Sequence, residues 1–164
     1  MKTILGLALL STMTISACLV AGAGEGSTLP RKAHFVRPAA VVQLYAGRTW
    51  LWKSGGGYFA PNQRFIAWSG KAKAKSYVDG KWYATARGKV CFEGVWHSAR
   101  SDGPNLTCFD HRIAGLAVYQ RKLPNGGWYL FKHARRVKGD EYNKLVAGDR
   151  VSSGLRRLEL AMGR

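Results

Sequence analysis

The chain is short of acidic residues. It contains 9 Asp and Glu against 26 Lys and Arg, which gives a formal net charge of +17. A field of this sign favours anionic partners such as nucleic acid, phospholipid headgroups or acidic polysaccharide, and it carries no information about the fold. The compartment in which the protein works must therefore distinguish among these partners.

Long hydrophobic runs are also missing. The apolar stretch at residues 3–17 follows Lys2 and is too short for a comfortable membrane span. We expect a secretory signal at residues 1–23, because the sequence AGA at its end suits ordinary signal peptidase. The alternative is a lipoprotein signal that ends before Cys18, which would then be acylated. Export to the periplasm or beyond argues against a nucleic-acid partner, and membrane contact would require the lipid at Cys18.

Cysteine is scarce, with three in the chain. Loss or lipidation of Cys18 leaves Cys91 and Cys108 as an even pair in an oxidising compartment. We expect these two to form a structural disulfide, which would contribute about 3 kcal/mol by closing the loop between them. A metal site would need more ligands, and the nearby His97 and His111 fit no zinc-binding spacing, so no metal or other cofactor is expected.

Motifs that would support catalysis are missing as well. The sequence has no Gly-x-Ser-x-Gly elbow, metal-binding histidine pair, phosphate-binding loop or reactive cysteine. The best candidate is WHSARSDG at residues 96–103, in which His97 stands next to Ser98. A hydrolase of envelope polymers would use His97 as base with Glu93 or Asp110 in the same cleft. A histidine beside a serine in a turn is more often turn chemistry, so a noncatalytic protein is expected.

What the chain does have is a succession of short β-rich runs at roughly ten-residue intervals, which favours an all-β antiparallel meander over βαβ units. The meander would form a curled sheet, a sandwich or a small barrel. After a basic linker at residues 24–37, a single β-rich domain is expected over residues 38–164. Pro38 suits the first turn of a short helix that Gly47 would end. The expected strands cover residues 49–53, 57–60, 64–70, 73–78, 81–86, 89–96, 105–111, 116–122 and 127–133.

The cysteine pair predicts the register of one hairpin. If Cys91 faces Cys108 across two antiparallel strands, Trp96 falls opposite Gly103 and residues 98–101 form the turn. The predicted disulfide and the predicted hairpin therefore support each other.

Two dipeptides predict tight turns. Asp-Gly at residues 79–80 and Asn-Gly at residues 125–126 both suit a two-residue hairpin turn, in which the central residues need a positive φ. Near the end of the chain, Leu155, Leu158 and Met162 are spaced for one or two helical turns against the sheet.

Aromatic residues gather in TWLWKSGGGYFAPNQRFIAWSG, residues 49–70. Such side chains fill a small β-core more often than they bind a ligand. The alternative function is a lipocalin-like carrier of a small apolar ligand, with a pocket lined by Trp50, Trp52, Tyr58 and Trp68.

Lysine and alanine alternate in GKAKAKSY, so that Lys71, Lys73 and Lys75 would project from one face of a strand. The predicted Asp-Gly turn would place Tyr77 opposite Trp82, with both rings beside these lysines. Our leading hypothesis is a noncatalytic exported protein that binds anionic polysaccharide or other envelope or extracellular material through these five residues. The simpler alternative is an edge strand that lysines protect from aggregation.

A second basic run is RRVKG at residues 135–139, with Lys132 and His133 just before it. Charge runs usually lie on solvated surface. Nine acidic residues cannot neutralise such a surface, so adhesion to anionic envelope material is expected, whether specific or not.

The order of the motifs TWLW, GGGYFAPNQRFIAWSG, YVDGKWY, GKVCF, WHS, LTCFDHR, VYQR, GWYLF and DEYNKLVAGDRV resembles a family of small exported bacterial proteins, domain of unknown function 995. The similarity runs from about Val41 to Val151. It implies export and a single β-rich domain, but no activity and no catalytic residues. GKAKAKSY and FKHARRVKG are more basic than the pattern requires, so anion binding could belong to the family or to this chain alone. The resemblance also marks as pattern positions the aromatic-glycine stretch, Cys91, Cys108, His97 and His111.

Overall fold

The computed structural model describes residues 28–71 and 74–163. The expected signal at residues 1–23, Cys18 and the start of the linker lie outside these ranges. The helical elements are α1 (Pro38–Tyr45), the 3₁₀ helix η1 (Glu141–Lys144) and α2 (Ser152–Ala161). The strands are β1 (His34–Phe35), β2 (Arg48–Trp52), β3 (Gly55–Phe59), β4 (Arg64–Lys71), β5 (Ala74–Ala84), β6 (Lys89–Ser98), β7 (Asp102–Ala114), β8 (Ala117–Lys122), β9 (Tyr129–Lys132) and β10 (Leu145–Ala147).

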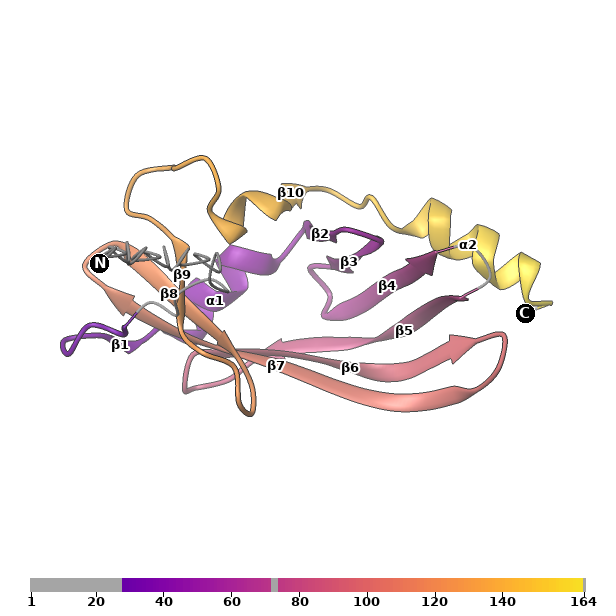
Figure 1. Ribbon diagram of the computed structural model, residues 1–164, viewed down its shortest axis with the longest axis horizontal. Coiled ribbons are helices and arrows are strands. Elements are labelled where there is room, and N and C mark those ends of the chain that lie inside the picture. The colour runs from indigo at the N-terminus through magenta and orange to yellow at the C-terminus, as the bar shows by residue number, and fades with distance from the viewer. Residues whose placement is uncertain (1–27, 72–73, 164) are drawn as a thin grey trace, which may run out of the picture.

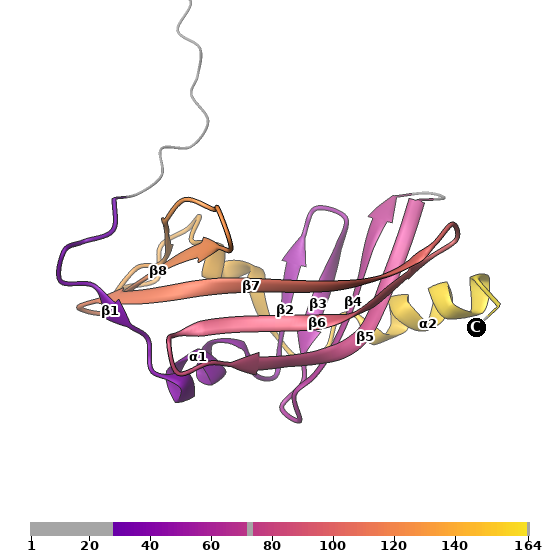
Figure 2. The ribbon, with the colours of Figure 1, turned by 90° about the horizontal axis from the view of Figure 1, so that it is seen from below.

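The described strands form one antiparallel sheet that curls around α1 into a half barrel (Figures 1 and 2). Hydrogen-bonded neighbours follow the order β10-β2-β3-β4-β5-β6-β7-β8-β9, and β1 adds to the sheet by pairing with β7. Except for β1 and β10, neighbours in the sheet are also neighbours in sequence. The all-β meander and the curled sheet predicted from the sequence are therefore confirmed.

The folded domain starts before residue 38, within the segment expected to be a linker. His34 and Phe35 pair with Ile113 and Arg112 of β7. Val36, directly after β1, is buried in the core. The end of the expected linker is thus part of the sheet.

The short helix predicted after Pro38 is present, with this proline in its first turn. Val41 and Tyr45 are four residues apart, so they share one helical face and are buried against the sheet, whereas Val42 is exposed. The chain leaves the helix through Gly47, whose φ of +71° favours glycine.

Aromatic side chains fill the concave face of the half barrel around Tyr45. Its ring centroid lies 5.0 Å from that of Phe59, which in turn lies 5.0 Å from Phe65. Trp82 and Phe131 are buried in the same cluster. Each such ring contributes about 2–3 kcal/mol by leaving water, so the aromatic-glycine stretch helps to form the main core.

A smaller core covers the opposite face of β4 and β5, where α2 packs. Leu155 and Leu158 of α2 are buried against Ile66 and Tyr77. The helix predicted from the spacing of the C-terminal apolar residues is therefore present. Neither α1 nor α2 has the length and apolar character that a membrane crossing would need within the described residues.

The tight turn predicted at residues 79–80 is wrong, because β5 continues straight through this dipeptide. Gly80 has a different role: a Cβ atom at this position would lie 2.0 Å from the carbonyl oxygen of Glu93 on β6. Asp79 accepts hydrogen bonds from Arg64 of β4 and so holds the neighbouring strand. The β4–β5 hairpin turns earlier, after Lys71, which pairs with Ala74.

The hairpin of β6 and β7 has the predicted register. Cys91 pairs with Cys108 and the two form a disulfide, while Trp96 pairs with Gly103. The turn at residues 98–101 is closed by backbone hydrogen bonding. By contrast, the two-residue turn predicted at residues 125–126 is replaced by a longer loop between β8 and β9.

Candidate functional site

The five residues of the predicted basic face do not form one surface. Tyr77 and Trp82 stand five residues apart on β5, so their side chains point to opposite faces, and they are only 5% and 2% exposed. Tyr77 pairs with Trp68 of β4. The predicted pairing of Tyr77 with Trp82 is wrong, because the turn on which it depends is absent. Lys73 and the side chain of Lys71 lie outside the described residues. Lys75 lines a small cavity beside α2.

The four aromatic residues predicted to line a carrier pocket are divided between the two faces of the sheet. Trp50 and Trp52 belong to the concave core, whereas Tyr58 and Trp68 pack in the cluster beneath α2. They therefore line no common cavity. Phenylalanine rings and Tyr45 occupy the interior that a small apolar ligand would need.

His97 has a carboxylate partner, but it is neither of the two predicted. Its Nδ1 lies 3.0 Å from an oxygen of Asp102, and its ring lies 5.1 Å from that of Tyr77. Glu93 is paired with a lysine on β5, and Asp110 with two arginines on its own side of the sheet. Ser98 donates its hydroxyl to the Ser101 carbonyl at 2.7 Å, as expected of turn chemistry.

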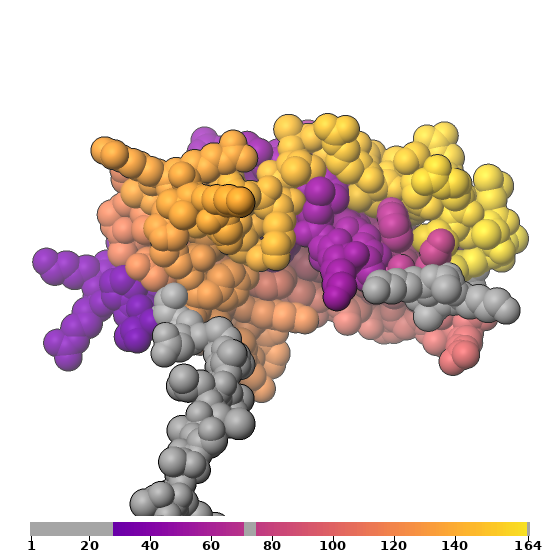
Figure 3. Space-filling model, turned by 45° about the horizontal axis from the view of Figure 1, so that its top comes forward, coloured from indigo at the N-terminus to yellow at the C-terminus, as the bar shows by residue number. Residues whose placement is uncertain are grey.

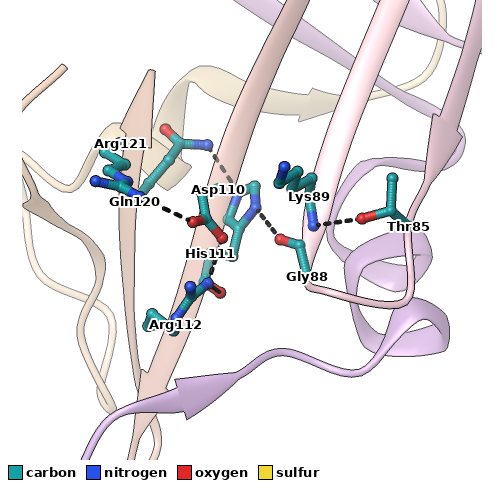
Figure 4. Close-up of polar contacts among 8 residues, drawn as sticks. All are labelled: Thr85, Gly88, Lys89, Asp110, His111, Arg112, Gln120 and Arg121. Carbon is teal, nitrogen blue, oxygen red and sulfur yellow. Dashed lines mark hydrogen bonds and ion pairs between the residues drawn. The ribbon is translucent and has the colours of Figure 1, made fainter. Parts of the chain in front are cut away.

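His111 lies in a fully buried polar network (Figure 4). Its Nδ1 is 3.0 Å from the carbonyl oxygen of Gly88, and its Nε2 is 2.9 Å from the hydroxyl of Tyr45 and 2.8 Å from Nε2 of Gln120. A neutral ring donates from Nδ1 to Gly88 and offers the lone pair of Nε2 to two donors, the Tyr45 hydroxyl and the Gln120 amide, which share it. Burial lowers the pKa of His111 to about 4, against the opposing effect of the Gly88 hydrogen bond. The network fixes α1 to β7 and β8.

A group of arginines lies on the other face of β7 (Figure 4). Asp110 is buried and accepts hydrogen bonds from Arg112 and, at 3.5 Å, from Arg121. The Trp128 ring covers both guanidinium groups, with centroid distances of 5.3 Å to Arg112 and 4.7 Å to Arg121. One carboxylate and one ring thus hold this arginine pair against the sheet.

A cationic cleft opens where η1 bridges the two edges of the sheet. This helix contacts β9 at one edge and β10 and β2 at the other. Figure 3 shows the face on which the segment around η1, in orange, adjoins the yellow C-terminal segment. The cleft has a volume of about 510 Å³. We call it the seam cleft; its polar lining consists of Arg48, Lys132, Arg136, Asp140, Tyr142 and Asn143.

Two cations contact the aromatic ring of the seam cleft. Arg48 approaches from β2, with Cζ 5.7 Å from the ring centroid of Tyr142, and Lys132 from the end of β9, with Nζ at 5.8 Å. Cation–π attraction of this kind contributes about 0.5–1 kcal/mol at exposed sites. Arg136 donates from Nε to the side-chain oxygen of Asn143 at 3.0 Å. Contacts with neutral partners therefore hold all three cations.

The carboxylate in the lining, Asp140, is held by His133. Nδ1 of His133 is 2.5 Å from one carboxylate oxygen, and its backbone N–H donates to the other at 3.1 Å. Burial alone would raise the pKa of Asp140, but these two hydrogen bonds, the charge of His133 and the backbone N–H of Val137 together lower it. None of Arg48, Lys132 and Arg136 belongs to an ion pair within residues 28–71 and 74–163. The cleft thus presents positive charge that no carboxylate in this part of the chain pairs directly.

The fold and the cleft define a small all-β protein with a cationic site at the seam of a half barrel. The chain belongs to the family described as "Protein of unknown function (DUF995)", whose model matches residues 8–151. The family resemblance seen in the motifs is thereby confirmed. No curated protein and no solved structure matches the chain.

Proposed function

We propose that the protein is a noncatalytic, exported protein that binds an anionic polymer of the cell envelope or the extracellular space in its seam cleft. The observation that carries this proposal is that three cations line one cleft with Tyr142, two of them against its ring. One cleft contains Arg48, Lys132 and Arg136 without an ion pair. The carboxylate beside them, that of Asp140, is paired with His133.

The chemistry of the cleft suits carboxylate, sulfate or phosphate groups. Two guanidinium groups can each bind an oxyanion with paired hydrogen bonds, and Lys132 adds a mobile point charge. A volume of about 510 Å³ lies within the usual range of small-ligand pockets, about 300–1,000 Å³. The cleft therefore has room for a short segment of an acidic polymer.

Two features of the chain support export. The Cys91–Cys108 disulfide is typical of proteins in oxidising compartments. The sequence of residues 1–23 has the pattern of a secretory signal. An anionic envelope polymer is a more suitable partner for an exported protein of charge +17 than nucleic acid.

The test is binding of the protein, residues 24–164, to immobilised polygalacturonate and dextran sulfate over a salt series. The site variant replaces the three cations: Arg48→Gln, Lys132→Gln and Arg136→Gln. Loss of three contacts at about 0.5–1 kcal/mol each predicts affinity roughly 10–100-fold weaker, together with a flatter salt dependence.

The matched control removes the same charge elsewhere. Arg87, Arg100 and Lys122 are exposed and are not part of the seam-cleft lining, and replacing all three by Gln also lowers the net charge by three. We expect this control to change the affinity by less than about threefold, the size of a diffuse charge effect. Equal losses in the two variants would mean that binding depends on net charge alone, and the seam cleft would not be a site.

A further inference from the structure

A second, smaller cavity lies between α2 and the β4–β5 pair. Its volume is about 210 Å³. We call it the α2 cleft; it is lined by Trp68, Lys75, Gly154, Arg157, Leu158 and Ala161.

The charged lining of the α2 cleft is entirely positive. Lys75 comes from the start of β5 and Arg157 from α2. Neither side chain forms an ion pair with any other described residue. Glu159, on the same helix, is not in the lining. It lies instead near Arg64, where the Asp79 hydrogen bond is the main cause of a raised pKa and the charge of Glu159 adds a smaller increase.

The α2 cleft also contains an indole N–H without a hydrogen-bond acceptor in the described protein. Trp50, Trp52 and Trp82 each donate from Nε1 to an oxygen of the protein, whereas Trp68 does not. A Cβ atom at position 154 would lie 2.4 Å from Nε1 of Trp68. Because residue 154 is glycine, the backbone of α2 can approach this edge of the indole, and no side chain at this position covers the N–H.

We propose that the α2 cleft is a second anion site, which binds one carboxylate, sulfate or phosphate group through Lys75, Arg157 and the N–H of Trp68. A charge-assisted hydrogen bond to each of these donors would satisfy the unpaired cations and the unpaired indole together. The site stands on these three residues and does not depend on the seam cleft.

The position of the α2 cleft gives it a role in polymer binding, and this step rests on the proposed function. The segment around η1 leads through β10 to the helix α2, and both segments lie on the face seen in Figure 3. One polymer chain that enters both clefts pays the entropy of association once, so its affinity rises with length once it reaches from one cleft to the other. The α2 cleft thus makes the protein selective for long anionic chains over single acidic residues.

Indole N–H signals in a ¹H–¹⁵N NMR spectrum test the two clefts separately. Trp68→Phe assigns the Trp68 signal, and Trp50, which donates to Glu141 at 3.0 Å beside Tyr142, reports on the seam cleft. The protein is titrated with inorganic phosphate and with galacturonate oligomers of increasing length. We expect a saturable downfield shift of the Trp68 N–H with both probes, which is lost in the Lys75→Gln, Arg157→Gln variant while the Trp50 response remains.

The outcomes distinguish the two proposals. A Trp68 signal that stays fixed while Trp50 responds would remove the α2 cleft and leave the seam cleft. The reverse result would leave the α2 cleft and remove the proposed function. Response to phosphate but not to galacturonate would limit the site to phosphate groups and overturn the part of the proposal that includes carboxylates.

Affinity for oligomers of increasing length provides a second measurement. We expect at least about a tenfold gain from short to long galacturonates, as two linked contacts imply, and loss of that gain in the Lys75→Gln, Arg157→Gln variant. The charge-matched control is Arg87→Gln, Lys122→Gln, which should keep the gain. If the α2 variant keeps the gain as well, the two clefts do not share one polymer chain.

Discussion

Arg48 and Lys132 approach the same ring, that of Tyr142, at almost equal distances of 5.7 and 5.8 Å. The first residue lies on β2, next to the β10 edge of the sheet, and the second ends β9, the other edge. The two cations therefore meet because the half barrel brings its edges together at η1. This closure creates the seam cleft, which no single strand contains.

Tyr142 should matter for binding through its ring and not through its hydroxyl. Tyr142→Leu removes both cation–π contacts, worth about 1–2 kcal/mol together, so affinity for polygalacturonate should fall roughly 5–30-fold. Tyr142→Phe keeps the ring and should retain most of the affinity. Isothermal titration calorimetry on both variants provides the comparison, and similar losses in the two would show that the ring does not position the cations.

The hydroxyl of Tyr45 should be important for stability. It contacts His111 and accepts a hydrogen bond from Gln120 at 2.5 Å in a fully buried network. Tyr45→Phe removes both hydrogen bonds and leaves one N–H of Gln120 without its acceptor, which should lower the free energy of unfolding by about 1–3 kcal/mol. Tyr83→Phe is the control, because the Tyr83 hydroxyl forms no hydrogen bond with the described protein. Urea denaturation of both variants measures the difference, and equal values would contradict the importance of the network.

Acid should destabilise the protein through His111. Its pKa is about 4 in the folded state, below the ordinary value of 6.5, so the unfolded chain binds the proton more readily between these two values. Stability from this residue is therefore complete above about pH 6.5 and falls as the pH drops towards 4, by about 3 kcal/mol. Urea denaturation at pH 7 and pH 4 should show this loss. A His111→Gln variant should be less stable at pH 7 and should lose less stability on acidification. If the variant loses as much stability as the unmodified protein, groups other than His111 cause the loss.

Gly80 and Gly103 should respond differently to the same substitution. A methyl group at position 80 would meet the carbonyl oxygen of Glu93 at 2.0 Å, so the strands must shift, whereas nothing lies within 4 Å of the equivalent position at Gly103. We expect Gly80→Ala to lower the free energy of unfolding by about 2 kcal/mol or more, and the melting temperature with it. Gly103→Ala should lower the free energy of unfolding by less than about 1 kcal/mol. Thermal denaturation followed by circular dichroism compares them. A mild effect at position 80 would mean that the sheet has more room than its backbone distances indicate.

Much of the fold follows from local patterns. The proline-started helix, the β-rich runs and the spacing of Leu155 and Leu158 each carry a local signal, and the structure contains the corresponding elements. The cysteine pair was informative over a longer range, since one disulfide gave the register of a whole hairpin. The wrong prediction of a turn at residues 79–80 has a physical cause. Glycine occurs in turns and also where two backbones approach closely, and the dipeptide alone does not distinguish these two uses.

The seam cleft was only partly visible in the sequence. Lys132 and the basic run after it stand out in the sequence, but such a run predicts only a solvated surface. Arg48 has no distinguishing pattern, and the motif DEYNKLVAGDRV gives Tyr142 no role, because their meeting depends on the pairing of β10 with β2 across most of the chain. The predicted face at Tyr77 and Trp82 is wrong, because the strand register that would form it requires a turn at residues 79–80 that is absent.

The Cys91–Cys108 bond joins directly opposed residues of two strands that are already paired. A slip of β6 by one residue would exchange inward and outward side chains, so that Lys89 would replace Val90 in the concave core. The covalent link forbids this exchange as long as it is intact. In an oxidising compartment, the hairpin is therefore committed to a single alignment, and with it the placement of His111 beneath α1.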